Sequence, residues 1–381
     1  MSSMQAEPTH VPEHPDEITA EWLSGALGVP IRSVRRQILG EGQGFLGDIV
    51  RLHLETDAEG VPASVVAKIP KLANRAVGEL LGVYERESRF FNDFASNVPV
   101  RIPELYFSHC DPDEDSAHQK EILAKVDGLP GFTHGLATVI GKFVAGRKNR
   151  RYVLIMEDLG EFEPGDQHAG ASLEQCARVL EEFASTHRSF WRCDSLDESF
   201  WLVPLGLDAR IRAGVYRKSV KALREVAPPG LEPYIEKLRE LGGELVRRLA
   251  EEAPKTLIHC DLRLDNVCFD GNEVAFLDWQ LVRSGPAAYD VAYFLGGALA
   301  PETSAEDEER LLRRYHDELC VTDYPFEQFH RDYQRALLAS LAAVAPTPDV
   351  EIDEGRGQEM MQRWRERLGA RLAHVDVDRL L

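Results

Sequence analysis

Residues 257–280, with the sequence LIHCDLRLDNVCFDGNEVAFLDWQ, place charged and amide side chains inside two apolar runs. Within these runs stand His259, Asp261, Asn266 and Asp278. Buried strands rarely carry so many polar groups unless the groups bind a ligand or take part in catalysis. The spacing of these four residues is typical of the catalytic loop and the metal-binding aspartate of phosphoryl-transfer enzymes.

Phosphoryl transfer needs a divalent ion to screen the phosphates, and Mg²⁺ prefers oxygen ligands. We predict that Asn266 and Asp278 are Mg²⁺ ligands, supplied from two strand ends that face each other across the turn at residues 270–272. Asp261 is predicted to orient the acceptor hydroxyl and to take its proton. We interpret His259 as a structural group that holds the loop by hydrogen bonds. A polar-capped β-hairpin is the simpler alternative, but it does not explain four spaced polar groups on buried strands.

Arg263 lies two residues after the predicted base, and its role has two interpretations. Its forked, always charged side chain can contact the transferred phosphoryl group or the acceptor. Alternatively, it forms an ion pair with Asp265 that only stiffens the loop. Both interpretations stay open at this point.

A glycine cluster near the N-terminus is the second candidate site. Gly42, Gly44 and Gly47 match the pattern G-x-G-x-x-G. The cluster lies between two predicted strands and not between a strand and a helix, which favours a flap over nucleotide phosphates and argues against a dinucleotide-binding turn. Glycine lets backbone amides approach a phosphate closely. A flexible hairpin turn is the alternative.

Lys68 stands inside the apolar run VVAKIP, where a buried ammonium group needs a partner. Glu87, on the helix predicted next in the chain, is the carboxylate that we expect to pair with it. A strand lysine held by a helix glutamate and reaching nucleotide phosphates is a known phosphoryl-transfer arrangement. The alternative is a lysine whose stem packs while its charged head reaches solvent.

Hydrophobic periodicity predicts where these residues lie. The N-terminal part predicts a helix over residues 17–28, three strands around the glycine cluster, a helix over residues 77–95 and two later strands, ELYFSH and RYVLIMEDL. Helical stripes then follow at about 172–190, 231–249, 287–299, 305–319, 326–344 and 354–373. We therefore expect an α+β fold with a β-rich N-terminal lobe over residues 1–157 and a mostly helical C-terminal lobe over residues 158–381.

Composition excludes several classes of protein. The formal charge of −20 argues against binding to nucleic acid, which relies on Lys and Arg. The apolar stretches are too short to span a membrane, and the polar N-terminus does not resemble a secretion signal. Six scattered cysteines without a C-x-x-C pair suit reduced thiols, so we expect a cytoplasmic protein.

The chain resembles the aminoglycoside phosphotransferase and choline kinase group, which has a bilobal protein-kinase-like fold. The matching motifs run from about residue 17 to at least residue 300: AEWL, YERESRFF, LIMEDLG, PGDQHAG, STHRSFW, HCDLRLDN and LDWQLVRSGPAAYDVAYFL. The last motif is most similar to the ecdysteroid-kinase-like branch, whose bacterial members include many of unassigned substrate.

The resemblance implies roles for further residues. Glu157 to Leu159 would be the hinge whose backbone contacts adenine, and Asp290 would brace the catalytic loop. His187, on an apolar helical stripe, is interpreted as a core histidine. For Asp166 and Gln167, contact with the ribose or acceptor and stabilisation of a loop are both open.

Two features depart from the resemblance. Relatives commonly have glycine after the loop histidine, where this chain has Cys260. Residues 111–151 form an insertion of some forty residues where a short connection is expected. Its start is predicted to be a loop, HQKEILAKV a helix, and the apolar, glycine-rich remainder a cover for the cleft or a surface for a partner.

The predicted function is ATP-dependent, Mg²⁺-assisted phosphorylation of a hydroxyl group on a small molecule, most consistent with a neutral or lipophilic alcohol. Phosphorylation of an aminoglycoside antibiotic is one alternative. A catalytically weak nucleotide-binding pseudokinase that acts through partners is another, although the intact Lys68, Asp261, Asn266 and Asp278 count against it. A monomer and a homodimer are both open.

Overall fold

The computed structural model describes residues 10–39, 46–113, 118–148, 150–346 and 355–380. The chain divides into two compact units. The first unit comprises Met1–Ala95, Ile102–Glu114 and Thr138–Glu161, and the second comprises Ser96–Arg101, Asp115–Ala137 and Phe162–Leu381.

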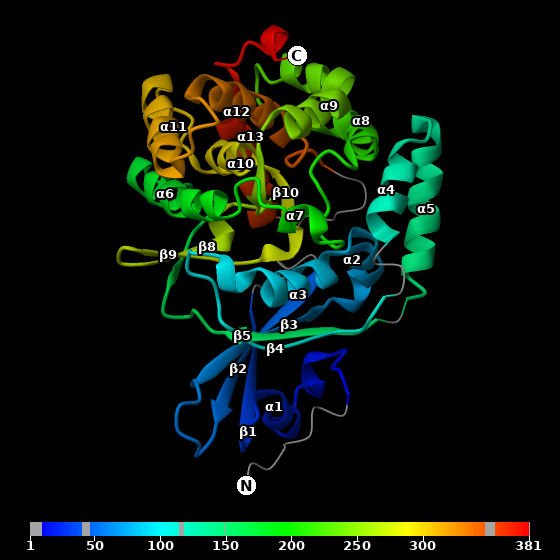
Figure 1. The fold of residues 1–381 in the computed structure, drawn as a ribbon, viewed down its shortest axis with the longest axis vertical. Helices are drawn as coiled ribbons and strands as arrows, with labels where there is room; N and C mark the ends of the chain where they lie inside the picture. The colour runs from blue at the N-terminus through cyan, green and yellow to red at the C-terminus, as the bar shows by residue number, and fades with distance from the viewer. Residues whose placement is uncertain (1–9, 40–45, 114–117, 149, 347–354, 381) are drawn as a thin grey trace. The chain divides into compact units, whose positions relative to one another are not determined.

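The first unit is built on an antiparallel sheet of five strands in the order β1-β2-β3-β5-β4 (Figure 1). Its strands are β1 (Ser33–Leu39), β2 (Gly47–Glu55), β3 (Ser64–Pro70), β4 (Leu105–Cys110) and β5 (Tyr152–Glu157). The opening helix α1 (Ala20–Leu27) is capped by the Thr19 side chain at its start and by Gly28, in the left-handed conformation, at its end. The five predicted strands and the opening helix are therefore confirmed.

One face of this sheet packs against α1, and the other face carries Lys68. Ala67 and Ile69 on β3 are buried in a core with Trp22 and Leu23 of α1. Because side chains alternate along a strand, Lys68 between them points to the opposite face. The long helix predicted over residues 77–95 is wrong in one respect: it is two helices, α2 (Arg75–Leu81) and α3 (Val83–Asp93). The break falls at Gly82, whose φ of +66° is left-handed and ends the first helix.

The second unit is mostly helical, and α10 is its central helix (Figure 1). Its larger helices are α6 (Leu173–Ser189), α8 (Ala209–Val226), α9 (Glu232–Glu252), α10 (Ala287–Ala298), α11 (Ala305–Leu319), α12 (Phe326–Ser340) and α13 (Arg356–Leu372). Nearly every residue of α10 is buried, since α6, α12 and α13 all pack against it. The predicted helices are present, and α8 was not among the predictions.

Short elements in the second unit carry the loop that the sequence singles out. They are β6 (Glu163–Pro164), α7 (Ser195–Glu198), β7 (Lys255–Ile258), β8 (Val267–Asp270), β9 (Glu273–Phe276) and β10 (Arg283–Pro286), with the 3-10 turns Leu264–Asn266 and Trp279–Leu281. β7 pairs with β10, and β8 pairs with β6 and β9. The predicted hairpin turn therefore joins β8 to β9.

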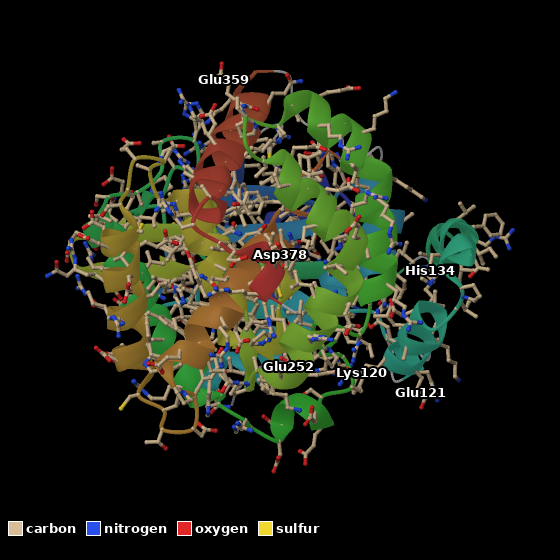
Figure 2. The ribbon with its side chains drawn as sticks, turned by 90° about the horizontal axis from the view of Figure 1, so that it is seen from above. Lys120, Glu121, His134, Glu252, Glu359 and Asp378 are labelled. Atoms are coloured by element: carbon tan, nitrogen blue, oxygen red, sulfur yellow. The ribbon has the colours of Figure 1, made fainter. Side chains whose placement is uncertain are left out.

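The insertion between β4 and β5 is helical. It holds α4 (Gln119–Asp127) and α5 (His134–Ala145), and Figure 2 labels Lys120 and Glu121 on α4 and His134 at the start of α5. The helix predicted at HQKEILAKV is confirmed, and residues 114–117 of the predicted loop lie outside the described residues. Asp127, at the end of α4, accepts hydrogen bonds of 2.8 and 2.9 Å from the first amides of α8.

A pocket of about 520 Å³ lies in the second unit between residues 127–134 of the insertion, α8 and α9. Its walls include small residues, Ala209, Ala213 and Gly243, and a Cβ atom at Gly243 would lie 3.5 Å from the Cβ of Ala213, so α8 and α9 pack closely here. The apolar remainder of the insertion is α5, on which Val139, Ile140, Phe143 and Val144 are exposed.

Two further observations concern the membrane and cysteine predictions, and a third concerns the C-terminal segment. None of the described helices has the length and apolar character needed to cross a membrane. All six cysteines are described, and none of them is paired in a disulfide bond. Near the C-terminus, Asp378 (Figure 2) forms an ion pair of 2.8 Å with Lys237 of α9.

Candidate active site

Lys68 and Glu87 form an ion pair within the first unit. The Nζ atom of Lys68 lies 2.8 Å from Oε2 and 2.9 Å from Oε1 of Glu87. Both side chains are largely buried, with exposed fractions of 11% and 4%. The predicted pairing is therefore present, and it holds the ammonium group on the face of the sheet opposite the α1 core. Contact of this pair with a nucleotide remains a prediction.

The glycine cluster is described only at its end. Gly42 and Gly44 lie outside the described residues, while Gly47 is the first residue of β2. A Cβ atom at Gly47 would lie 3.2 Å from the carbonyl oxygen of Ile69, so a larger residue would crowd the pairing of β2 with β3. The hydroxyl of Tyr84 donates a hydrogen bond of 2.7 Å to the carbonyl of Leu46. This contact, which was not predicted, fixes the chain where the cluster ends.

The predicted hinge follows β5. The backbone amide of Glu157 donates to the carbonyl of Glu104 at 2.8 Å, and the Glu157 side chain accepts from the Glu104 amide at 3.1 Å. Leu159 is half-buried. Between them, Asp158 accepts two hydrogen bonds from Arg51, at 2.7 and 3.0 Å, and one from Ser64 at 2.6 Å.

These contacts decide the charge of Asp158. Partial burial acts to raise the pKa of its carboxyl, but the hydrogen bonds from Arg51 and Ser64 lower the pKa below its usual value. Asp158 is therefore an anionic anchor that ties the hinge to β2 and β3. This role gives no signal in the sequence, because Arg51 lies more than a hundred residues from Asp158 along the chain.

The loop after β7 is held by a buried carboxylate on α10. Asp290 accepts hydrogen bonds from the backbone amides of His259 (2.6 Å) and Cys260 (2.9 Å). His259 is fully buried, and its Nε2–H donates to the carbonyl of Leu277 at 2.9 Å. The ring of His187 also lies 3.3 Å from the Asp290 carboxylate. The interpretations of His259 as structural, His187 as a core histidine and Asp290 as a brace are thus confirmed.

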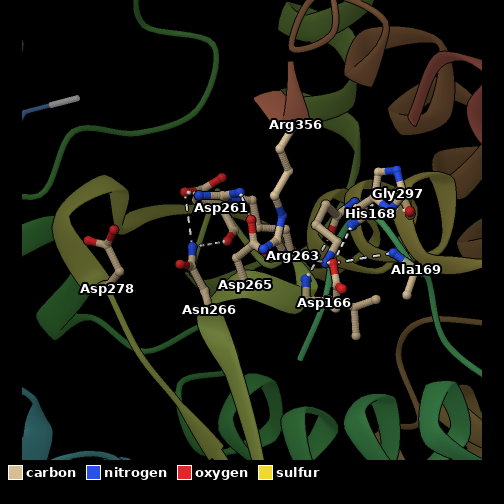
Figure 3. Close-up of polar contacts among 12 residues, drawn as sticks. Asp166, His168, Ala169, Asp261, Arg263, Asp265, Asn266, Asp278, Gly297 and Arg356 are labelled. Carbon is tan, nitrogen blue, oxygen red and sulfur yellow. Dashed lines mark hydrogen bonds and ion pairs between the residues drawn. The ribbon is translucent and has the colours of Figure 1, made fainter. Parts of the chain in front are cut away.

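Asp261 stands at the centre of the loop, beside Asn266 (Figure 3), and both of its carboxylate oxygens accept hydrogen bonds. Asn266 Nδ2 donates to its Oδ2 at 3.0 Å and to its backbone carbonyl at 2.9 Å. The hydroxyl of Tyr293 donates to Oδ1 at 2.9 Å. Burial raises the pKa of Asp261, and the nearby charge of Asp278 acts in the same direction, while Arg263 opposes both.

Arg263 contacts two carboxylates. Its Nη1 pairs with Asp265, and its Nε lies 3.6 Å from Oδ2 of Asp261. Asp265 also accepts a hydrogen bond of 3.0 Å from the amide of Gln167. The ion pair with Asp265 is therefore present, and it leaves the guanidinium beside the predicted base.

Asn266 and Asp278 are tied together by the backbone. The amide of Leu277 donates to the carbonyl of Asn266 at 2.9 Å, which brings Asp278 close to Asn266 (Figure 3). Because Asn266 uses its NH₂ group to bind Asp261, its amide oxygen is the end that can serve as a ligand. Asp278 has a left-handed φ of +62°. A carboxylate and an amide oxygen on two hydrogen-bonded segments fit the preference of Mg²⁺ for oxygen ligands.

A Mg²⁺ ion held by Asn266 and Asp278 would need further ligands in addition to these two side chains. Among the described residues, no three His, Cys, Asp or Glu side chains are grouped so as to hold a metal. Mg²⁺ is commonly bound by one or two protein oxygens together with phosphates and water. The donor set therefore suits an ion that arrives with a nucleotide.

Gln167 is a part of the site whose role the sequence left open. It is fully buried, its Oε1 accepts from the amide of Leu264 at 2.8 Å, and its Nε2 donates to the carbonyl of Gly297 at 3.0 Å. A Cβ atom at Gly165 would lie 2.3 Å from the Leu264 carbonyl, so the approach of the two segments requires glycine. Gln167 therefore braces the loop that carries Asp261. Asp166 instead pairs with Arg356, 3.3 Å away (Figure 3).

Comparisons with known proteins identify the family of this chain. Residues 48–330 match the model of the phosphotransferase enzyme family. No curated protein sequence matches the chain. Similar solved structures include an amicoumacin kinase bound to AMP-PNP and Ca²⁺, with 12% identity over 97% of this chain and 98% of that chain and a TM-score of 0.50.

Two further structures are more distant in shape. A choline kinase from Cryptosporidium parvum Iowa II has 12% identity over 90% of this chain and 87% of that chain, with a TM-score of 0.46. An aminoglycoside phosphotransferase solved with streptomycin and ATP has 13% identity over 88% and 93% of the two chains, with a TM-score of 0.47. The match to the family model and the shared fold of the amicoumacin kinase confirm the predicted α+β, protein-kinase-like fold and the resemblance to this group of phosphotransferases. The ecdysteroid-kinase-like branch remains a prediction.

Proposed function

Because the chain belongs to the phosphotransferase enzyme family, we propose that it transfers the γ-phosphoryl group of ATP to a hydroxyl group of a small, neutral or lipophilic alcohol. The observation that carries this proposal is the setting of Asp261. Its side chain is only 14% exposed, both of its carboxylate oxygens accept hydrogen bonds, and it lies beside Asn266 and Asp278, the two proposed oxygen ligands. Such a group is suited to orient a hydroxyl and to accept its proton.

We assign the remaining roles as follows. Asn266 and Asp278 would hold Mg²⁺, which when bound screens the phosphate charges. Lys68, fixed by Glu87, would contact the phosphates, and Gly42, Gly44 and Gly47 would cover them. The backbone from Glu157 to Leu159 would contact the adenine. Nucleotide binding would thus belong to residues 1–157, and acceptor binding and catalysis to residues 158–381.

Two observations support ATP and the alcohol. The amicoumacin kinase, which shares the fold, binds AMP-PNP. The motif LDWQLVRSGPAAYDVAYFL is most similar to the ecdysteroid-kinase-like branch, which favours a lipophilic acceptor over a cationic antibiotic. The proposal therefore names the class of acceptor and leaves the compound to experiment.

The test is turnover of ATP against a panel that includes sterols, other lipophilic alcohols, choline and aminoglycosides, with the mass of the product detected directly. We expect a phosphorylated lipophilic alcohol with the parent protein. Asp261→Asn should keep nucleotide affinity and lose on the order of 10²- to 10⁴-fold in rate. Asp278→Ala should also weaken Mg²⁺-dependent nucleotide binding.

The panel also separates the alternatives. A product formed only from an aminoglycoside would show that the acceptor is an antibiotic of that class and not a lipophilic alcohol. Nucleotide binding without any phosphorylated product would favour a pseudokinase. Undiminished turnover by folded Asp261→Asn protein would rule out the assigned base.

A further inference from the structure

The hydroxyl of Tyr293 holds the carboxylate of Asp261 from the side opposite to Asn266. Tyr293 lies on α10 three residues after Asp290, so both side chains project from the same side of the helix toward the catalytic loop. Asp290 binds the start of the loop through the amides of His259 and Cys260, whereas Tyr293 binds the side chain of Asp261 at 2.9 Å. With Asn266 on Oδ2 and Tyr293 on Oδ1, the carboxylate is fixed in rotation as well as in position.

The ring of Tyr293 is in turn held by the C-terminal helix α13. Trp364 packs against it edge to face, with 5.2 Å between ring centroids and an interplanar angle of 88°. Both rings are buried, with exposed fractions of 7% for Tyr293 and 4% for Trp364. An edge-to-face pair of this kind is favourable and has a defined geometry. Trp364 therefore limits where the Tyr293 hydroxyl can lie.

A second contact from α13 reaches the other flank of the loop. Arg367 donates to the carbonyls of Gln167 (2.6 Å), Gly297 (3.0 Å) and His168 (2.8 Å). Gln167 itself accepts from the amide of Leu264 inside the loop. A buried guanidinium with three carbonyl acceptors gives this segment a fixed position.

The close packing of α10 and α13 depends on the absence of a side chain at Gly297. A Cβ atom there would lie 2.5 Å from Nε2 of Gln167 and 3.0 Å from the ring of Trp364. No side chain fits, so glycine is needed for the helix, Gln167 and Trp364 to meet. Yet α13 begins at Arg356, beyond residues 48–330 that match the family model.

We infer that α13 is a positioning element for the catalytic loop, acting through Trp364 and Tyr293 on the Asp261 carboxylate. Tyr293 and Trp364 are positioning residues, since they act through Asp261. Arg367 supports the same loop through Gln167. The inference rests on the proposed role of Asp261 as the base.

The first test removes only the Tyr293 hydroxyl. Tyr293→Phe keeps the ring and its packing on Trp364, so the KM for ATP should stay near the parent value and the melting temperature should fall no further than in the control variant. The kcat should fall about tenfold or more, the size of one hydrogen bond to a charged group. The matched control is Tyr324→Phe, which removes the hydroxyl of another buried tyrosine that donates to Asp332 at 2.8 Å. The control should cost stability and leave kcat unchanged.

A double-mutant cycle then tests the path from α13. Trp364→Leu should lower kcat in the parent and have little further effect in the Tyr293→Phe background, because the contact it supports is already lost. Equal effects of Trp364→Leu in the two backgrounds would show that Trp364 acts through general stability, and would overturn the inference. An unchanged kcat in folded Tyr293→Phe protein would overturn it as well.

A structural measurement keeps this test apart from the test of function. In a crystal structure of Trp364→Leu, the Tyr293 hydroxyl should move out of hydrogen-bonding distance from Oδ1 of Asp261. An unmoved hydroxyl would contradict the inference whether or not the protein phosphorylates any alcohol. Absence of turnover in the parent, with a displaced hydroxyl in the variant, would reject the proposed function and retain the positioning role of α13.

Discussion

Asp290 accepts a hydrogen bond of 2.6 Å from the backbone amide of His259. Its second oxygen accepts from the amide of Cys260 at 2.9 Å, and the ring of His187 lies 3.3 Å from the first. Asp290, His259 and His187 are all fully buried. Since a buried carboxylate is stable only when its oxygens are paired, this arrangement ties the start of the loop that carries Asp261 to the first turn of α10.

Asp290→Asn should therefore weaken both the fold and the reaction. The new NH₂ group faces a backbone N–H in place of an acceptor, which leaves buried donors unpaired. We expect a loss of about 1–3 kcal/mol in the free energy of unfolding, measured by urea denaturation, together with a lower kcat. The control is Asp332→Asn, at another buried carboxylate of the second unit, which pairs with Tyr324 and Arg335. A kcat reduced equally in both variants would show that Asp290 matters only for stability.

Cys260 occupies a strained backbone position. Its φ of +63° is left-handed, a conformation that side chains other than glycine rarely adopt. Cys260→Gly should therefore fold and turn over as well as the parent, with a melting temperature equal to or above it. Cys260→Val, with its branched side chain, should lose about 1–2 kcal/mol. Thermal unfolding of the two variants checks this, and a more stable Val variant would contradict the expected strain.

The grouping of candidate site residues that lie near one another along the chain could be predicted from the sequence. Asp261, Asn266 and Asp278 have the spacing that is typical of phosphoryl-transfer loops, and a buried Lys68 needs a partner, which Glu87 supplies. The strand positions followed from alternation, which is a local property of the chain. The break between α2 and α3 could not be predicted in this way. It depends on the left-handed φ of Gly82, which the residue type alone does not specify.

The missed residues act through tertiary contacts. Tyr293 is close to Asp261 in space but 32 residues away along the chain, and Arg367 is 200 residues from Gln167. Neither contact can be inferred from residue type or from hydrophobic periodicity. The helix α8 was missed for a related reason: its buried stripe includes the small Ala209 and Ala213, which carry a weak hydrophobic signal.

Acid should destabilise the second unit through Asp208. Burial acts to raise its pKa, but the charges of Arg212 and Arg283, with their hydrogen bonds, hold the pKa well below its usual value. Arg283 binds both carboxylate oxygens, at 3.0 and 2.9 Å. A pKa lowered by folding contributes stability that is present above the unfolded value of about 3.9 and is lost as the pH falls below it.

The measurement is urea unfolding of the parent and of Asp208→Asn between pH 7 and pH 3. At pH 7 the parent should be more stable by about 3 kcal/mol, because the variant leaves Arg283 buried without its anion. The difference should shrink as the pH drops below about 4. A difference that stays constant with pH would show that Asp208 is not an anion with a lowered pKa.

The insertion should contribute to the stability of α8 through Asp127. Its carboxylate accepts from the amides of Arg210 and Ile211, which caps the first turn of that helix from a distant segment. Asp127→Ala should lower the free energy of unfolding by about 1 kcal/mol, the usual cost of a lost cap. Limited proteolysis should then cut first within the insertion. Unchanged stability together with unchanged protease resistance would show that α4 contributes no support to α8.

Arg263 offers the sharpest separation of two roles in the loop. Its guanidinium pairs with Asp265 and also lies 3.6 Å from the Asp261 carboxylate, so one geometry serves both interpretations. Arg263→Lys keeps a positive charge that can pair loosely with Asp265 but cannot make forked contacts. If Arg263 contacts the phosphoryl group or the acceptor, kcat should fall while the melting temperature and ATP affinity stay near the parent values. Asp265→Asn is the matched control, since it removes the ion pair and leaves the arginine in place. A drop in melting temperature in both variants with unchanged kcat would establish that Arg263 only braces the loop.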